Sequence, residues 1–134
     1  MTYLFCKCYY FSMLKKILCI LSILTILPVY SASSDNILTS NEKVVLYLYT
    51  KECGYCVKFD PIYNNVSKKY GNNCKFLKID ANSKYGRDLM RGFYAVYVPY
   101  VVIIDNSKRT AKSVNPDCLL NQACMQNVIE KFIN

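Results

Sequence analysis

The sequence predicts an α/β fold in which helices flank a central mixed sheet of about four strands. Short apolar runs rich in branched and aromatic residues alternate with segments whose apolar residues recur at helical spacing. The last two apolar runs are separated by a turn, which indicates an antiparallel edge beside a parallel portion. At 134 residues, without internal repeats or low-complexity tracts, the chain has room for a single domain.

Each expected element is supported by its own pattern. In chain order the elements are a strand over 43–49, a helix over 54–70, a strand over 75–80, a helix over 83–91, a strand over 100–104, a strand over 110–114 and a helix over 117–132. The first strand is almost continuously apolar, as expected of a buried central strand. Pro99 is expected at the start of the third strand. In the last helix, Asp117 is the candidate N-cap. Its apolar stripe is expected to contain Leu120, Cys124, Val128 and Phe132.

The beginning of the chain has the order of a secretory signal peptide. Lys15 and Lys16 precede an apolar run over 17–27, and small residues follow over 31–34. The run is shorter than the roughly 20 residues that cross a bilayer as a helix. We therefore expect cleavage of this segment and not permanent anchoring.

The pattern divides the chain into a signal peptide over 1–33 and a folded domain over 34–134. It predicts a periplasmic or secreted protein, with anchoring in the membrane by an uncleaved N-terminal segment as the alternative. The signal peptide can begin at either Met1 or Met13, and the sequence fits both starts equally. The charges of the domain are scattered singly, so we expect a solvated surface and no nucleic-acid partner. An exported compartment permits disulfides, and the cysteines of the domain are Cys53, Cys56, Cys74, Cys118 and Cys124.

Cys53 and Cys56 lie where the first buried strand gives way to the first helix. Unpaired backbone N–H groups and the helix dipole favour negative charge at a helix N-terminus, so the pKa of a thiol placed there is lowered. We expect Cys53 to be the exposed nucleophile. Cys56 faces the same end of the helix and can attack the mixed disulfide that Cys53 forms, which releases the substrate.

A Cys-x-x-Cys motif has two other interpretations. It can be half of a zinc site, but the chain contains no His. Cys74, Cys118 or Cys124 would then have to converge on the pair. It can also be a purely structural disulfide. We expect no metal and no cofactor.

Three features occur together within residues 43–133. They are the apolar strand that runs into Cys53-Gly54-Tyr55-Cys56, Pro61 five residues after the second cysteine, and the Val98-Pro99 pair at the start of a strand. Together they resemble the thioredoxin-fold thiol-disulfide oxidoreductases. The resemblance implies a thioredoxin-like fold and a redox-active disulfide between Cys53 and Cys56.

The resemblance also implies roles for residues outside the motif. Pro61 would be a structural residue that kinks the first helix. Pro99 would follow a cis bond and pack beside the cysteines, with the backbone of Val98 pairing with the substrate chain. Independently of the resemblance, Tyr55 and Tyr97 are expected to touch substrate, because they lie beside the cysteines or Pro99 in the sequence. The Gly-Tyr dipeptide between the cysteines is similar to that of periplasmic disulfide isomerases.

Three positions depart from the thioredoxin pattern. Tyr47 stands on the first strand where thioredoxins have a buried Asp, and Phe76 stands on the next strand where they have its Lys partner. The usual internal proton acceptor for Cys56 is therefore expected to be missing. Glu52 replaces the Trp that precedes the first cysteine, which changes the charge and shape of the surface that faces the substrate.

These observations predict an exported thiol-disulfide oxidoreductase that reduces or exchanges protein disulfides through Cys53 and Cys56. Its expected partners are client proteins with disulfides or thiols, and a redox partner that recharges the pair and could lie in the membrane. No dimerisation domain precedes the first strand, so we expect a monomer. The alternatives are a thioredoxin-fold interaction module with a structural disulfide and a metal-handling protein.

The remaining cysteines leave one pairing open. Cys118 and Cys124 are six residues apart, which along one continuous helix is a rise of about 9 Å, beyond the Cα separation of about 7 Å that a disulfide tolerates. A bond therefore requires Cys118 to lie before the helix, on the turn at Asn115-Pro116. Otherwise Cys124 is a buried thiol on the apolar stripe. Cys74 has no evident partner.

Overall fold

The structure is a computed structural model that describes residues 42–134. The expected signal peptide over 1–33 lies outside the described residues, as does its boundary with the folded domain. Within the described range, no helix is long and apolar enough to cross a bilayer.

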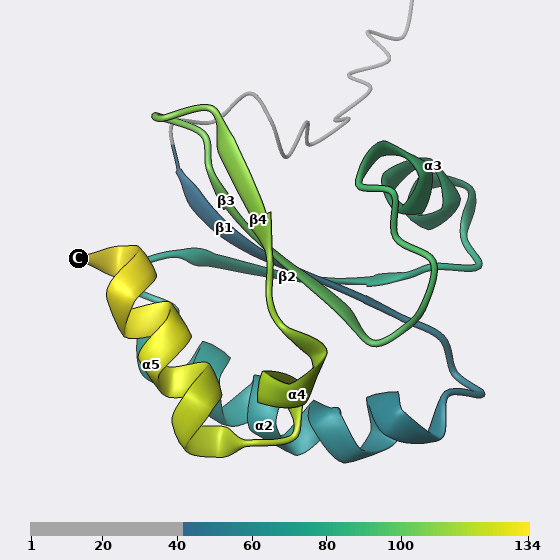
Figure 1. Cartoon of the computed structure of the whole chain (residues 1–134), viewed down its shortest axis with the longest axis horizontal. Helices are drawn as coiled ribbons and strands as arrows, with labels where there is room; N and C mark the ends of the chain where they lie inside the picture. Colours follow the sequence, from purple (N-terminus) through teal and green to yellow (C-terminus); the bar gives the residue numbers. More distant parts are fainter. Residues whose placement is uncertain (1–41) are drawn as a thin grey trace, which may run out of the picture. The chain divides into compact units, whose positions relative to one another are not determined.

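A four-stranded mixed sheet with helices on both faces forms the domain (Figure 1). The elements are β1 (Lys43–Tyr49), α2 (Gly54–Tyr70), β2 (Lys75–Asp80), α3 (Lys84–Gly92), β3 (Tyr100–Asp105), β4 (Thr110–Ser113), α4 (Pro116–Leu119) and α5 (Gln122–Ile133). The strand order is β2-β1-β3-β4, with β1 parallel to β2 and the other pairs antiparallel. The predicted fold class is confirmed.

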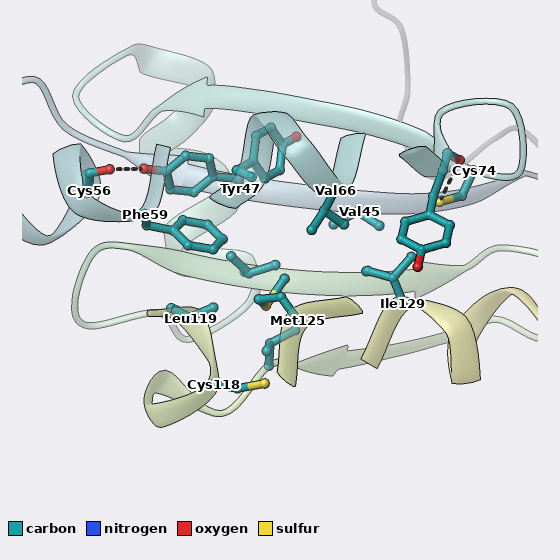
Figure 2. Close-up of a cluster of buried hydrophobic side chains, with 14 residues drawn as sticks. Val45, Tyr47, Cys56, Phe59, Val66, Cys74, Cys118, Leu119, Met125 and Ile129 are labelled. Atoms are coloured by element: carbon teal, nitrogen blue, oxygen red, sulfur yellow. Dashed lines mark hydrogen bonds between the residues drawn. The ribbon is translucent and has the colours of Figure 1, made fainter. Parts of the chain in front are cut away.

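The central strand β1 is buried on both faces, which its nearly continuous apolar sequence predicts. On one face, Val45 and Tyr47 join the larger core between the sheet and helices α2, α4 and α5 (Figures 1 and 2). On the other face, Val44, Leu46 and Leu48 join a smaller core beneath α3. Burying each such side chain contributes about 1.5–3 kcal/mol, so β1 is the most firmly held strand and gives the segment that follows it a fixed starting point.

The end of the chain differs from the single helix expected over 117–132. Two helices replace it, α4 and α5, and the chain changes direction between them at Leu120 and Asn121. The Asn115 side chain accepts a hydrogen bond from the Asp117 backbone N–H at 3.0 Å, and Asn121 accepts one from the Cys124 N–H at the same distance. Two asparagine caps therefore begin two helices, and Asp117 is not the N-cap.

The change of direction also shifts the buried face of the last helix. Met125 and Ile129 of α5 are fully buried, whereas Leu120 lies outside both helices and is 46% exposed. Cys124, Val128 and Phe132 are only partly buried against the same core. The fully buried residues of α5 are therefore displaced by one position from the predicted stripe.

Cys118 and Cys124 form a disulfide, with their Cα atoms 5.3 Å apart. The bond exists because Cys118 lies in the short helix α4, before the helix that carries Cys124, which is the condition that the spacing required. Cys74 is the free cysteine among the described residues, and it is buried. Its thiol lies 3.8 Å from the Tyr70 carbonyl oxygen.

Candidate active site

The two cysteines of the motif meet at the N-terminus of α2. They form a disulfide with their Cα atoms 5.2 Å apart. Cys53 is the N-cap residue, with an extended backbone, and Cys56 lies in the first turn of the helix. β1 and the turn after it bring Cys53 to this point, because the Cys53 N–H donates to the Thr50 carbonyl oxygen at 3.4 Å.

The environment of the two sulfur atoms is asymmetric. Cys53 is half-buried, whereas only 2% of Cys56 is exposed. The Cys56 backbone N–H donates to the Cys53 sulfur at 3.0 Å, so the helix N-terminus is directed at the outer cysteine. The first turn of α2 contains no acidic residue that would oppose a negative charge there. The geometry therefore favours a thiolate on Cys53 and makes Cys56 the inner, second cysteine.

The Val98-Pro99 pair lies against the outer cysteine. The bond between the two residues is cis, and Pro99 is buried. The Val98 carbonyl oxygen is 3.6 Å from the Cys53 sulfur, so the start of β3 and the start of α2 meet at the disulfide. The cis bond that the sequence resemblance implied is present. Pro61 lies inside α2, also as expected.

A hollow of about 430 Å³ opens beside the disulfide. It is lined by Tyr55, Tyr97, Val98, Pro99, Pro116, Asp117, Leu119 and Leu120. All four residues predicted to contact substrate are therefore brought to one place. Tyr55 is 64% exposed and Tyr97 is 42% exposed, so both rings are accessible to a bound chain.

Helix α4 supplies the wall of the hollow that sequence reasoning missed. Pro116, Asp117 and Leu119 come from this helix, and Leu120 follows it directly. The signal that could have found them was the Cys118–Cys124 spacing, because a bond between these residues requires the break that turns α4 toward the motif. A larger hollow of about 780 Å³ lies between β4 and α5, and it shares Tyr97 and Pro116 with the first hollow.

A polar cluster lies on the inner side of the motif, at the base of Cys56. The Tyr47 hydroxyl is 3.3 Å from the Cys56 carbonyl oxygen and 3.1 Å from Asp60 Oδ1 (Figure 2 shows the first contact). Lys78 Nζ donates to the same Asp60 oxygen at 2.7 Å. Tyr47 and Lys78 are paired residues of β1 and β2, so the sheet register places them side by side beneath α2.

Burial, and then the nearby carboxylate of Asp60, raise the pKa of Tyr47 far above its usual value. Tyr47 therefore stays protonated and acts as a hydrogen-bond donor. Its single proton can be donated to one acceptor at a time, either the Asp60 carboxylate or the Cys56 carbonyl oxygen.

A sequence model of the thioredoxin family matches residues 26–130. The chain belongs to the thioredoxin family. Family membership, together with Cys53 and Cys56 at disulfide distance, supports thiol-disulfide oxidoreductase activity. Within residues 42–134, no group of three or more His, Cys, Asp or Glu side chains is placed to hold a metal ion.

Known proteins agree with this assignment. The chain is 26% identical over 88 residues to a thioredoxin of Borreliella burgdorferi, an alignment that covers 66% of this chain and 71% of that one. Among solved structures, the J-Trx1 fragment of ERdj5 is similar with a TM-score of 0.64 and 17% identity, over 74% of this chain and 45% of that one. The oxidised thioredoxin of Plasmodium falciparum has a TM-score of 0.57 and 24% identity, over 75% of this chain and 89% of that one. These structures support the fold.

The polar cluster departs from the thioredoxin pattern in a way that the sequence alone did not reveal. The strand positions expected to carry an acid and a base hold Tyr47 and Phe76, and both side chains belong to the aromatic core. An acid and a base are nevertheless present nearby, because Asp60 comes from α2 and Lys78 from a different position of β2. The usual strand acid is therefore absent, as the sequence implies, and a different acid, Asp60 of α2, lies near Cys56.

Proposed function

We propose that this thioredoxin-family protein is an exported protein-disulfide oxidoreductase, with Cys53 as the nucleophile and Cys56 as the resolving cysteine. The observation that carries the assignment of roles is the asymmetry of the pair. The helix N–H group and the solvent reach Cys53, whereas Cys56 is enclosed in the core behind it. A client sulfur therefore has access to Cys53 alone.

The reaction consists of two thiol-disulfide exchanges. In the first, the Cys53 thiolate attacks a client disulfide, the Cys53–client bond forms, and the other client sulfur leaves as a thiolate that takes up a proton. In the second, Cys56 gives up its proton and attacks the Cys53 sulfur, which releases the second client thiolate and forms the Cys53–Cys56 bond. Two electrons pass from the cysteine pair to the client. An external dithiol partner then reduces the pair again, so reduction of clients is the direction we propose.

The hollow beside the disulfide is the proposed client site. An extended chain that lies along Val98 and Pro99 would bring its disulfide to Cys53, with Tyr55 and Tyr97 packing against the flanking side chains. The apolar and aromatic lining suits clients that expose hydrophobic residues next to a cysteine. No metal, cofactor or nucleic acid takes part in this scheme, and the protein acts as a monomer.

The proposed location rests on the N-terminal pattern of the sequence. Basic residues, a short apolar run and small residues are the order of a cleaved signal, so we propose action in the periplasm or outside the cell. Cell fractionation, with mass spectrometry of the mature N-terminus, tests this proposal. An N-terminus at Met1 or Met13 in a membrane fraction would support the uncleaved anchor instead.

The decisive experiment replaces the resolving cysteine. In Cys56→Ser the first exchange can occur but the second cannot, so clients should accumulate as mixed disulfides that are released by reductant. Cys53→Ser should trap nothing, and Cys74→Ser, which removes a buried thiol outside the motif, should behave as wild type. Failure of Cys56→Ser to form mixed disulfides would refute the assigned roles.

Two measurements on the wild type complete the test. Alkylation of the reduced protein at mildly acidic pH should be faster at Cys53 than for free cysteine, because the helix N-terminus stabilises the thiolate. Insulin reduction should show turnover with a dithiol reductant. A reduction potential below about −300 mV without turnover would indicate that the bond is structural and that the protein is an interaction module.

A further inference from the structure

In the second exchange, the buried Cys56 thiol must lose its proton. The thiol cannot attack until the proton is gone, and solvent has little access to it because only 2% of the residue is exposed. It also lacks the direct helix N–H contact that favours the Cys53 thiolate. Since burial in an apolar environment disfavours a thiolate, the proton needs an acceptor within the protein.

Asp60 is placed where such an acceptor would be useful. It lies one helical turn after Cys56 in α2, on the same face of the helix, and side chains in a helix lean toward the preceding turn. The Tyr47 hydroxyl connects the two residues, because it contacts both the Asp60 carboxylate and the Cys56 carbonyl oxygen. The carboxylate is therefore held two hydrogen-bond lengths from the backbone of the resolving cysteine.

The other members of the cluster cannot take the proton. Tyr47 stays protonated because burial and the Asp60 carboxylate raise its pKa, and Lys78 is a cation that donates to Asp60. Both contacts to Asp60 use Oδ1, so Oδ2 remains to accept a proton. The Asp60 side chain is 35% exposed, so a proton that it accepts can pass to solvent water.

We propose that Asp60 accepts the Cys56 proton during the second exchange, directly or through one water, while Tyr47 and Lys78 act as positioning residues that hold the carboxylate in place. This inference rests on the proposed function. As the proton passes from the Cys56 sulfur to Asp60, the sulfur attacks Cys53, the Cys53–client bond breaks, and the client sulfur leaves with the electron pair. Asp60 then releases the proton to solvent.

Lys78 has a second task in this arrangement. A carboxylate near a thiol opposes the thiolate by like-charge repulsion, and a cation paired with the carboxylate, here Lys78, reduces that repulsion. Lys78 also lies over the rings of Tyr47, at 5.4 Å, and Tyr49, at 4.5 Å, which fixes the ammonium group in this position. The cluster can therefore contain a base without a strong penalty for the thiolate.

Few other titratable groups lie around Cys56 in the described part of the chain. The elements packed around this part of the core contribute Tyr47 and Tyr49 from β1, Lys78 from β2, and Asp60 and Tyr63 from α2. Helix α4 contributes Leu119 and the disulfide-bonded Cys118, neither of which titrates, and the exposed Asp117, which lines the hollow beside the disulfide. Glu52, which directly precedes the motif, is also exposed. Burial raises the pKa of Tyr63, so it stays neutral as Tyr47 does. Asp60 differs from these two carboxylates because it contacts the Tyr47 hydroxyl, which also contacts the backbone of Cys56.

The test separates the two exchanges in one experiment. Reduced protein is mixed with dithiobis(nitrobenzoate), which gives one coloured thionitrobenzoate when Cys53 attacks and a second when Cys56 displaces the mixed disulfide. Stopped-flow absorbance between about pH 5 and pH 9 gives both rate constants for wild type, Asp60→Asn and Asp60→Glu. The matched control is Asp88→Asn, which removes a carboxylate of an exposed ion pair with Arg91 on α3.

We expect Asp60→Asn to slow the second release about tenfold or more near pH 6, since general bases contribute at least this much. The deficit should shrink toward alkaline pH, where solvent removes the proton without help. Asp60→Glu should restore most of the rate, and Asp88→Asn should match wild type. A structural role for Asp60 would not produce a deficit that disappears with rising pH.

Two results would overturn the inference. If Asp60→Asn left the second release within about twofold of wild type at pH 6, Asp60 would not be the acceptor. If the substitution accelerated the second release, the carboxylate would act only by repelling the thiolate. The first release reports on the proposed function separately, because its absence in wild type would refute the role of Cys53 whatever the second phase shows.

Discussion

The disulfide between Cys118 and Cys124 holds a wall of the proposed client site. Helix α4 has four residues, too few to be stable alone, so its position depends on the cross-link to α5 and on the burial of Leu119. Replacing both cysteines by Ala removes the bond without burying a hydroxyl group. The Cys53–Cys56 pair is unchanged, which leaves the chemistry of the motif available for comparison.

The size of the expected effect follows from the loop that the bond closes. A separation of six residues corresponds to about 2.2 kcal/mol of stabilisation in the chain-entropy relation for disulfides. For a domain of this size, such a loss lowers Tm by roughly 9–18 °C. The matched control is Cys74→Ala, which truncates another buried cysteine without breaking a bond.

Thermal unfolding followed by circular dichroism measures the stability, and two disulfide substrates measure the function. The double variant should lose activity toward insulin, which needs the wall formed by α4, and keep its rate with dithiobis(nitrobenzoate), which needs only the cysteine pair. A fall in Tm no larger than that of Cys74→Ala would show that packing of Leu119 holds α4 without the bond. Equal losses on both substrates would show that α4 supports the motif itself and not the client site.

Three further predictions concern other parts of the domain. Leu120→Ser should raise KM for insulin several-fold and leave the rate with dithiobis(nitrobenzoate) unchanged, because Leu120 is exposed in the hollow and contributes little to the core; a parallel change with both substrates would contradict this. Cys74 should resist iodoacetamide at pH 7 in the folded protein and react in urea, as mass spectrometry can show, because burial raises the pKa of its thiol. The hydrogen bond from the Ser107 hydroxyl lowers the pKa of Asp105, so this carboxylate stabilises the fold at neutral pH and the contribution is lost as the pH falls through its lowered pKa. Urea unfolding of Asp105→Asn should therefore show a deficit at pH 7 that narrows in acid, and a deficit independent of pH would refute the assignment.

The sequence predicts the strands and the first two helices because their signals are local. The apolar run of β1 and the helical spacing of α2 each lie within one continuous segment, and their bounds agree with the structure. The junction between them places Cys53 and Cys56 without any knowledge of the rest of the chain. Family resemblance then accounts for Pro99 and its cis bond, which local pattern alone does not predict.

The features that the sequence missed depend on contacts between distant segments. The helix breaks at Leu120 and Asn121 because the Asn121 side chain caps a new helix there. The Cys118–Cys124 disulfide can form only with this break, since one continuous helix would hold the two cysteines too far apart. The polar cluster near Cys56 requires the register of β1 against β2, which pairs Tyr47 with Lys78. A periodicity argument assigns each residue a face, but it does not say which residue of the neighbouring strand lies beside it.

Because Tyr47 replaces a strand acid, this position of β1 contributes to core packing, and the charged groups near Cys56 lie elsewhere. The Tyr47 ring packs edge-on against Phe59 at 5.0 Å and beside Tyr63 at the same distance, so the strand position contributes aromatic packing that a carboxylate could not. A carboxylate buried at that position would also carry a large desolvation cost. Asp60 and Lys78 lie instead at the edge of the core, each about one-third exposed, where pairing costs less and water can exchange the proton. Tyr47→Phe tests this division directly: the ring packing should persist, so stability should fall by no more than about 3 kcal/mol, the upper value of one hydrogen bond to a charged group. The second thionitrobenzoate release should nevertheless slow near pH 6, because the carboxylate loses the hydroxyl that orients it toward Cys56. Unchanged kinetics in that variant would mean that Lys78 alone is enough to position Asp60.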